Sequence, residues 1–250
     1  MIQFSYHHYK QMFATKNDGN HECPRKSILQ RSPKEEDEEI LSQTLDWLQG
    51  SVIGLNLCPF AEKPFQQKKM NIDVIQGSDQ VEILSLVLGE CLKRKDEPGT
   101  SLMVCPELFP SNFRAFLEVY NMLENGVLLD NDLDGYIQVA PFHPLFEFEG
   151  SSPQAIDNYT NRSPYPIFHV LREVEVDTAV KALDGDSSKV WKRNVELLET
   201  LEAKLGREKT EQVLLTGKEE DDNDGNNTTS DKIAKILQWF KKGRETDIDI

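Results

Sequence analysis

The residues best suited to chemistry in this sequence lie in residues 157–173, which read DNYTNRSPYPIFHVLRE. This stretch combines guanidinium, amide, carboxylate and imidazole groups, which are supplied by Arg162, Arg172, Asn158, Asn161, Glu173 and His169. Planar guanidinium donors suit a carboxylate or a phosphate, and an imidazole can exchange protons near neutral pH. The residue types therefore predict recognition of a small anionic metabolite, with the arginines as the clamp and His169 as an acid/base candidate.

Two other stretches carry functional groups that core packing does not require. Residues 54–61, GLNLCPFA, contain Cys58, and residues 142–148, FHPLFEF, contain His143 directly after a predicted strand. Ligands of open parallel sheets bind beyond the carboxyl ends of the strands, which favours a site near His143. If the three stretches converge, His143, His169 and Cys58 form the catalytic group of one pocket. Its substrate-binding group is then Arg162, Arg172, Asn158, Asn161 and Glu173.

Cys58 is compatible with three roles. As a nucleophile it would need His143 or His169 as a base, and the partial negative charge of the preceding helix end opposes the thiolate. As a zinc ligand it would share the ion with both histidines, although their spacing follows no local ligand pattern and the nearby arginines repel a cation. As a structural thiol it would be buried before Pro59.

The arginines also have a structural interpretation, in which Arg172 pairs with Glu173 or Asp157 and holds the loop against the sheet. Three functions therefore stay open: an enzyme or binding protein for a small anion, a non-enzymatic interaction protein whose motif is structural, and a zinc-dependent hydrolase. The sequence does not identify a cofactor, because it has no glycine-rich phosphate loop, no GxSxG and no HExxH.

The elements that must position these residues follow from the apolar pattern. The acidic run Glu35–Glu39 after Pro33 suits a helix N-terminus, and apolar residues at helical spacing over residues 41–55 continue this helix, which Pro59 must end. Short apolar runs predict strands over residues 72–75, 102–105, 136–140 and 168–171. Helical patterns separate the first three strands, which is typical of right-handed crossovers. We predict a single α/β domain with a mainly parallel sheet of about four strands and flanking helices.

Composition divides the chain into four parts. Residues 1–33 lack periodicity and predict a flexible N-terminal extension, and residues 34–206 hold the α/β domain. Residues 207–230 form an acidic linker region, and residues 231–250 contain an amphipathic C-terminal helix. This helix either docks on the domain or binds a protein partner.

Charge and hydropathy exclude several classes of partner. The formal net charge of -15 argues against binding to nucleic acid or to an anionic membrane, since both require clustered lysine and arginine. No apolar run approaches the roughly 20 residues that span a bilayer. Four cysteines without a CxxC pair and the lack of a signal peptide favour a soluble, intracellular protein of the cytoplasm. The early lysines Lys10 and Lys16, without an acid among the first 17 residues, leave an organelle as the alternative.

Three motifs carry a resemblance to a known family. They are WLxxxVIGLNLCPFA from Trp47 to Ala61, QVAPFHPLFEF from Gln138 to Phe148, and DNYTNRSPYPIFHVLRE followed by the Arg193-Asn194 pair. Over Trp47 to Asn194 the chain resembles the uncharacterised family catalogued as domain-of-unknown-function family 1415. The resemblance implies no activity, because the family has none established. The family usually has a tyrosine where this chain has Phe146.

Overall fold

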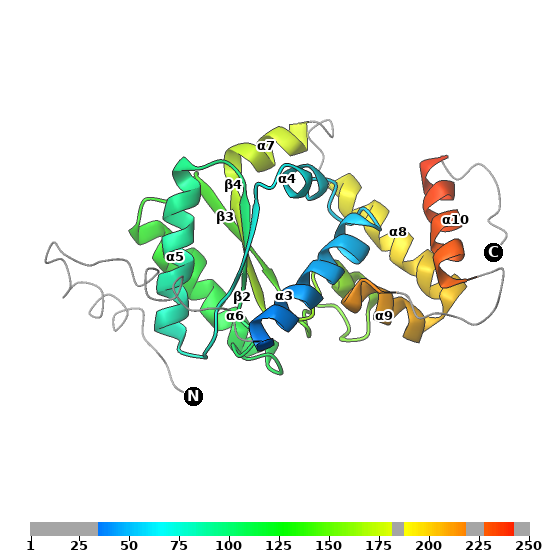
Figure 1. Ribbon diagram of the computed structural model, residues 1–250, viewed down its shortest axis with the longest axis horizontal. Coiled ribbons are helices and arrows are strands. Elements are labelled where there is room, and N and C mark those ends of the chain that lie inside the picture. The colour runs from blue at the N-terminus through cyan, green and yellow to red at the C-terminus, as the bar shows by residue number, and fades with distance from the viewer. Residues whose placement is uncertain (1–34, 182–187, 219–227, 243–250) are drawn as a thin grey trace, which may run out of the picture.

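A four-stranded mixed sheet lies at the centre of the computed structural model, which describes residues 35–181, 188–218 and 228–242 (Figure 1). Its strands, in spatial order, are β1 (Met70–Val74), β2 (Thr100–Val104), β4 (Ile167–Arg172) and β3 (Ile137–Phe142). β1 and β2 are parallel, whereas β4 is antiparallel to both of its neighbours. The four strands and the α/β class are confirmed, but the prediction of a mainly parallel sheet is wrong.

The connections between strands explain the direction of β4. Helix α5 (Gln80–Asp96) links β1 to β2, and α6 (Phe113–Met122) with the π-helix η2 (Leu123–Leu128) links β2 to β3. The segment between β3 and β4 contains only the short 3-10 helix η3 (Ile156–Thr160). A parallel return needs a crossover of a dozen or more residues, usually an α-helix. This connection is long enough for a crossover but holds no α-helix, and the chain returns antiparallel to β3, in the position between β2 and β3.

One face of the sheet packs against α5 and α6, and we call it the α5/α6 face. Side chains alternate between faces along a strand, and Met103, Val139, Phe168 and Val170 belong to the cluster on this side. The ring of Phe116 stacks on that of Phe168 at a centroid distance of 5.0 Å. The α5/α6 face therefore holds the larger apolar core of the sheet.

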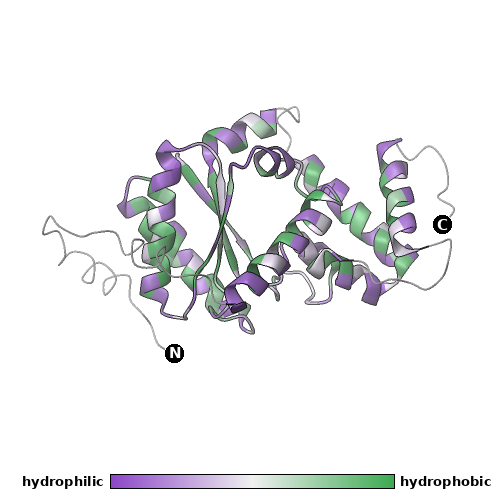
Figure 2. Cartoon of the chain, viewed as in Figure 1, coloured by the Kyte–Doolittle hydropathy of each residue, from purple (hydrophilic) through white to green (hydrophobic). Residues whose placement is uncertain are grey.

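Helix α3 (Glu35–Trp47) packs on the opposite face and continues as the π-helix η1 (Leu48–Ile53). Its first turn is acidic, and Figure 2 shows the start of this helix as hydrophilic. Negative side chains are favourable at the positive end of the helix dipole. Gly54 N–H donates to Gln49 O at 2.8 Å, which is the five-residue spacing of a π-helix. The predicted helix over 41–55 is thus two helical segments with different hydrogen-bond spacing.

Three further helices form a second apolar cluster beside η1. They are α8 (Ser188–Leu205), α9 (Arg207–Thr216) and α10 (Thr229–Lys241). Helix α9 occupies the first part of residues 207–230, where the sequence predicted an acidic linker, and α10 docks on α8. The predicted extension over 1–33 lies outside the described residues, as do 219–227 and 243–250.

Two short helices complete the described fold. Helix α4 (Glu62–Gln66) precedes β1, and α7 (Glu173–Lys181) follows β4 directly. Figure 1 places both at the same end of the sheet, where β1 and β2 begin and β4 ends. Within the described ranges, no helix combines the length and the apolar character needed to cross a membrane.

Candidate functional site

His143 lies on the α5/α6 face, directly after β3. Its ring packs against those of Phe113 and Phe116 at centroid distances of 5.3 and 5.1 Å, and none of its surface is exposed. Nε2 donates to the carbonyl of Phe109 at 3.1 Å, and Nδ1 accepts the N–H of Leu145 at 3.0 Å. Burial lowers the pKa of His143, and the hydrogen bond to Phe109 opposes this shift. Both ring nitrogens of the neutral imidazole therefore bind backbone groups.

Two predicted substrate-binding amides hold the segment between β3 and β4 together. Asn158, which is fully buried, accepts the N–H of Phe148 at 3.0 Å and donates to the carbonyl of Ser152 at 2.8 Å. Asn161 donates to the carbonyl of Pro141 at 3.4 Å. Buried polar groups are normally satisfied in this way, and both amides have backbone partners here.

Arg162 also binds this segment. Its Nε donates to the carbonyl of Phe146 at 3.2 Å, and its Nη2 donates to that of Pro153 at 2.7 Å. The guanidinium carbon lies 4.3 Å from the ring centroid of Tyr159, within the range of a cation–π contact. Phe146 packs against Phe113 at a centroid distance of 5.0 Å. The guanidinium fork of Arg162 is thus directed at backbone carbonyls.

Arg172 lies at the last position of β4. Its Nη1 pairs with Glu175 at 3.1 Å, and its Nη2 donates to the carbonyl of Lys95 at 3.3 Å. Glu175 belongs to α7 and Lys95 to α5, so Arg172 connects two helices at one end of the sheet. The carboxylate partner is Glu175 rather than either acid that the sequence suggested.

These positions separate the predicted site residues. Arg162 precedes β4 and Arg172 ends it, and five strand steps of roughly 3.4 Å place about 17 Å between the two ends of β4. Arg172 and His169 project to opposite faces, because side chains alternate along a strand, and His143 lies across the sheet from His169. The expected single pocket is therefore not formed. The roles of the individual residues, including Glu173 beside Arg172, stay predictions.

The loop that carries Cys58 is held by Arg193 and Asn194 of α8. Arg193 Nη1 donates to the carbonyl of Asn56 at 2.8 Å, and Asn194 Nδ2 donates to that of Leu57 at 2.6 Å. Asn56 has φ 54°, a left-handed conformation that asparagine tolerates better than most residues. The first motif and the Arg193-Asn194 pair are therefore two halves of one structural contact.

The thiol of Cys58 is half-buried. Burial raises its pKa, while hydrogen bonds from the backbone N–H groups of Phe60 and Ala61 oppose the shift. A raised pKa keeps the thiol protonated at neutral pH, which disfavours a nucleophile. Across the described ranges, no group of three His, Cys, Asp or Glu side chains is placed to hold a metal ion. The zinc-hydrolase interpretation therefore has no ligand set there.

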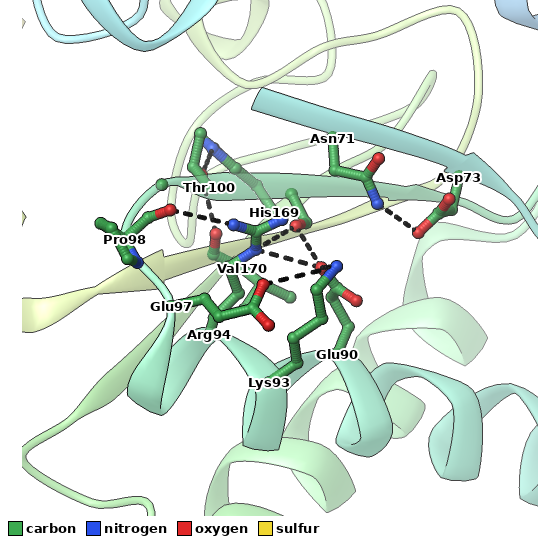
Figure 3. A network of polar contacts seen from close by, with 12 residues as sticks. Asn71, Asp73, Glu90, Lys93, Arg94, Glu97, Pro98, Thr100, His169 and Val170 are labelled. Atoms are coloured by element: carbon green, nitrogen blue, oxygen red, sulfur yellow. Dashed lines mark hydrogen bonds and ion pairs between the residues drawn. The ribbon is translucent and has the colours of Figure 1, made fainter. Parts of the chain in front are cut away.

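His169 differs from His143 because one of its ring nitrogens has no hydrogen-bond partner among the described residues. Its Nε2 lies 2.7 Å from Thr100 Oγ1, and that hydroxyl donates to the carbonyl of Val170 at 2.7 Å (Figure 3). Because the hydroxyl proton is used, Thr100 accepts from Nε2–H, and this fixes a tautomer with a lone pair on Nδ1. Nδ1 has no hydrogen-bond partner in the described part of the chain. Burial lowers the pKa of His169 from its ordinary 6.5 to about 4.

A buried ion pair on the opposite face holds the residues around Thr100. Arg94 Nη1 donates to the carbonyl of Pro98 at 3.1 Å, and its Nε donates to Ser101 Oγ at 2.9 Å (Figure 3). Glu90, whose side chain is fully buried, accepts from Arg94 Nε at 3.1 Å and from Ser101 Oγ at 2.7 Å. These contacts on both sides of Thr100 fix the start of β2.

The turn before Thr100 requires glycine. Gly99 has φ 116°, and a Cβ there would lie 2.2 Å from the carbonyl oxygen of Lys69. Its N–H donates to Glu175 at 3.1 Å, so the carboxylate that pairs with Arg172 also holds this turn. Helices α5 and α7 thus both position the hydroxyl that orients His169.

The surface around His169 is apolar and incompletely covered. We define the His169 face as Met70, Ile72, Ala140, Phe142, His169 and Leu171, all of which are half-buried. Ala140 lies directly opposite His169 across the β3–β4 pair, and the Phe142 ring lies 6.1 Å from the imidazole. Helix α3 packs over Val104 and Ile167, and its last residue, Trp47, covers part of the His169 face, with its ring centroid 5.6 Å from that of Phe142. The His169 face therefore combines an apolar floor with one free acceptor.

Sequence reasoning missed the residues that orient His169. Thr100 and Arg94 belong to no motif, and the sequence shows only a Pro98-Gly99 turn before an apolar strand. Their partners lie 69 and 7 residues away, at His169 and Ser101. Only strand pairing between β2 and β4 reveals the first contact.

Comparison with known proteins gives one match. The model of a family described as "Protein of unknown function (DUF1415)" matches residues 39–208, a range that contains all three motifs and extends to the first turn of α9. No curated protein and no solved structure matches the chain.

Proposed function

The chain belongs to the DUF1415 family of unknown function, and we propose that it binds a small molecule on the His169 face. The ligand has an apolar body and one O–H or N–H donor, which binds His169 Nδ1. The observation that carries this proposal is the unpaired Nδ1 of a tautomer-locked imidazole on a half-covered apolar surface. Small-molecule sites typically combine apolar walls with a few placed polar groups.

A ligand with a hydrogen-bond donor suits His169 Nδ1 better than an anionic ligand does. A carboxylate or phosphate has no proton to donate to Nδ1, so it would need the imidazolium. Protonating a group with a pKa of about 4 costs about 1.4 kcal/mol for each pH unit above that pKa. Arg162 and Arg172, which the sequence suggested as the anion clamp, donate to backbone carbonyls and to Glu175.

Binding is favoured over proton abstraction for the same reason. A general base works best when its pKa lies near the working pH, and a pKa of about 4 makes His169 a weak base at neutral pH. His143 has no free nitrogen, and Cys58 is a protonated thiol. The proposal therefore assigns His169 the recognition of a ligand donor.

The test is an NMR titration with two probes, indole as an apolar donor and inorganic phosphate as an anion. Indole should shift the His169 Nδ1 resonance and the amides of Ala140 and Phe142, whereas phosphate should leave Arg162 and Arg172 unchanged. His169→Leu keeps an apolar side chain and should weaken indole binding about tenfold, the value of one good hydrogen bond. Cys58→Ser serves as the control and should bind normally.

Two results would overturn the proposal. Indole shifts that map to the segment between β3 and β4 would place the ligand elsewhere. Phosphate shifts at the arginines that disappear in Arg162→Lys would restore the anion clamp.

A further inference from the structure

A hollow of about 420 Å³ lies between α8 and α10, at the opposite end of the molecule from α5 (Figure 1). Helix α8 lines it with Glu196, Glu199, Thr200, Ala203 and Lys204, and α10 lines it with two aromatic rings. None of these residues belongs to the His169 face or to the three motifs. The hollow is thus a feature separate from the site described above.

The aromatic wall comes from Trp239 and Phe240 near the end of α10. Their ring centroids are 5.2 Å apart and the rings are nearly perpendicular, at 86°. The guanidinium carbon of Arg193 already lies 5.8 Å from the Phe240 ring centroid. This internal contact shows that a cation is compatible with that ring, since cations are attracted to aromatic faces within about 6 Å.

On the face of α8 that lines the hollow, the acidic side chains precede the basic one. Glu196 and Glu199 are one turn apart on the face that lines the hollow, and Lys204 follows eight positions after Glu196, or about 12 Å along the helix. Phe240 contacts Arg193, which is one turn before Glu196, so the aromatic wall is at the acidic end. Aromatic rings and carboxylates therefore meet at the same end of the hollow.

We propose that this hollow binds an arginine side chain of a basic protein partner. A guanidinium can stack on an aromatic ring while its N–H fork binds a carboxylate, and an ammonium cannot do both as well. The formal net charge of -15 steers a basic partner toward the protein. The exposed carboxylate of Glu199 then selects its arginine at α8.

The probe is a hexa-arginine peptide, titrated at about 150 mM salt, where surface charges more than roughly 8 Å apart are largely screened. Glu199→Gln should weaken binding about threefold, and Trp239→Leu should weaken it by a similar factor, in line with exposed ion-pair and cation–π contacts. Hexa-lysine should bind more weakly than hexa-arginine. Amide shifts should map to α8 and α10.

Matched controls distinguish binding in this hollow from general attraction by the net charge of the protein. Glu118→Gln removes the same charge from α6, and Trp191→Leu removes an exposed tryptophan of α8 that does not line the hollow. Both should bind hexa-arginine as the unmodified protein does. The proposal is overturned if Glu118→Gln weakens binding as much as Glu199→Gln, or if amide shifts map outside α8 and α10. Glu199 is exposed, so its variant keeps the test valid if Trp239→Leu fails to fold.

Discussion

The segment around His143 and the face around His169 both place an imidazole beside aromatic rings, but they use its nitrogens differently. His143 gives one nitrogen to Phe109 and the other to Leu145, so the backbone satisfies it completely. In His169, Nε2 is hydrogen-bonded to Thr100, and Nδ1 has no hydrogen-bond partner among the described residues. The comparison separates a histidine that stabilises the fold from one that has an acceptor available for a ligand.

The same contrast extends to the surrounding polar groups. Near His143, the side chains of Asn158 and Arg162 bind the backbone of the segment between β3 and β4, and that of Asn161 binds Pro141 at the end of β3. Segments without regular structure have backbone groups that no sheet or helix satisfies, so side chains must supply the partners. A dense cluster of polar residues in a long connection is therefore weak evidence for a ligand site.

The largest expected effect comes from replacing the satisfied histidine. His143→Ala removes a fully buried ring and leaves Phe109 O and Leu145 N–H without their partner. We expect a loss of about 3 kcal/mol in the free energy of unfolding, measured by urea denaturation. His169→Ala is the matched control and should cost about 1 kcal/mol, since one hydrogen bond is lost. Equal losses of unfolding free energy in the two variants would contradict the distinction between the two histidines.

An intermediate effect is expected at Arg162. Arg162→Ala removes hydrogen bonds to Phe146 O and Pro153 O and a cation–π contact with Tyr159. We expect a loss of about 1–2 kcal/mol in the free energy of unfolding. Arg162→Lys keeps the charge but lacks the fork, so it should recover only part of this loss. Full recovery by lysine would show that charge matters more than the backbone contacts.

At neutral pH the titration of His169 has the smallest effect of the three, and its effect develops only as the pH falls. Its folded-state pKa of about 4 lies below the ordinary 6.5, so the unfolded state takes up the proton first as the pH falls. Above about pH 6.5 the group contributes nothing, and between 6.5 and 4 it lowers the free energy of unfolding. The slope is at most about 1.4 kcal/mol per pH unit.

Unfolding curves of the unmodified protein and of His169→Gln, taken between pH 7 and pH 4, measure this contribution. Glutamine cannot be protonated, so stability should fall less steeply in the variant. The pH dependence of stability that remains in His169→Gln includes the contribution of His143, whose pKa is also lowered. Identical slopes in the two proteins would contradict the lowered pKa of His169.

Local patterns predicted the strands well because each is a short apolar run bounded by glycine or proline. The run at residues 102–105 overlaps β2, and the run at residues 168–171 lies within β4. Strand order was not predictable in this way, because the antiparallel position of β4 depends on the connection that follows β3. The predicted residues do not converge on one site for a related reason, because alternation along β4 directs His169 and Arg172 to opposite faces of the sheet.

The sequence by itself determined the family, the α/β class and the stretches rich in polar groups, because these depend on residue types and spacing along the chain. The tertiary structure decided which of those groups are already satisfied. Arg162 and Asn158 find backbone partners only when the segment between β3 and β4 folds on itself, and His143 also needs the carbonyl of Phe109, which precedes α6. The free Nδ1 of His169 likewise depends on Thr100, a residue that lies beside it only through the pairing of β2 with β4.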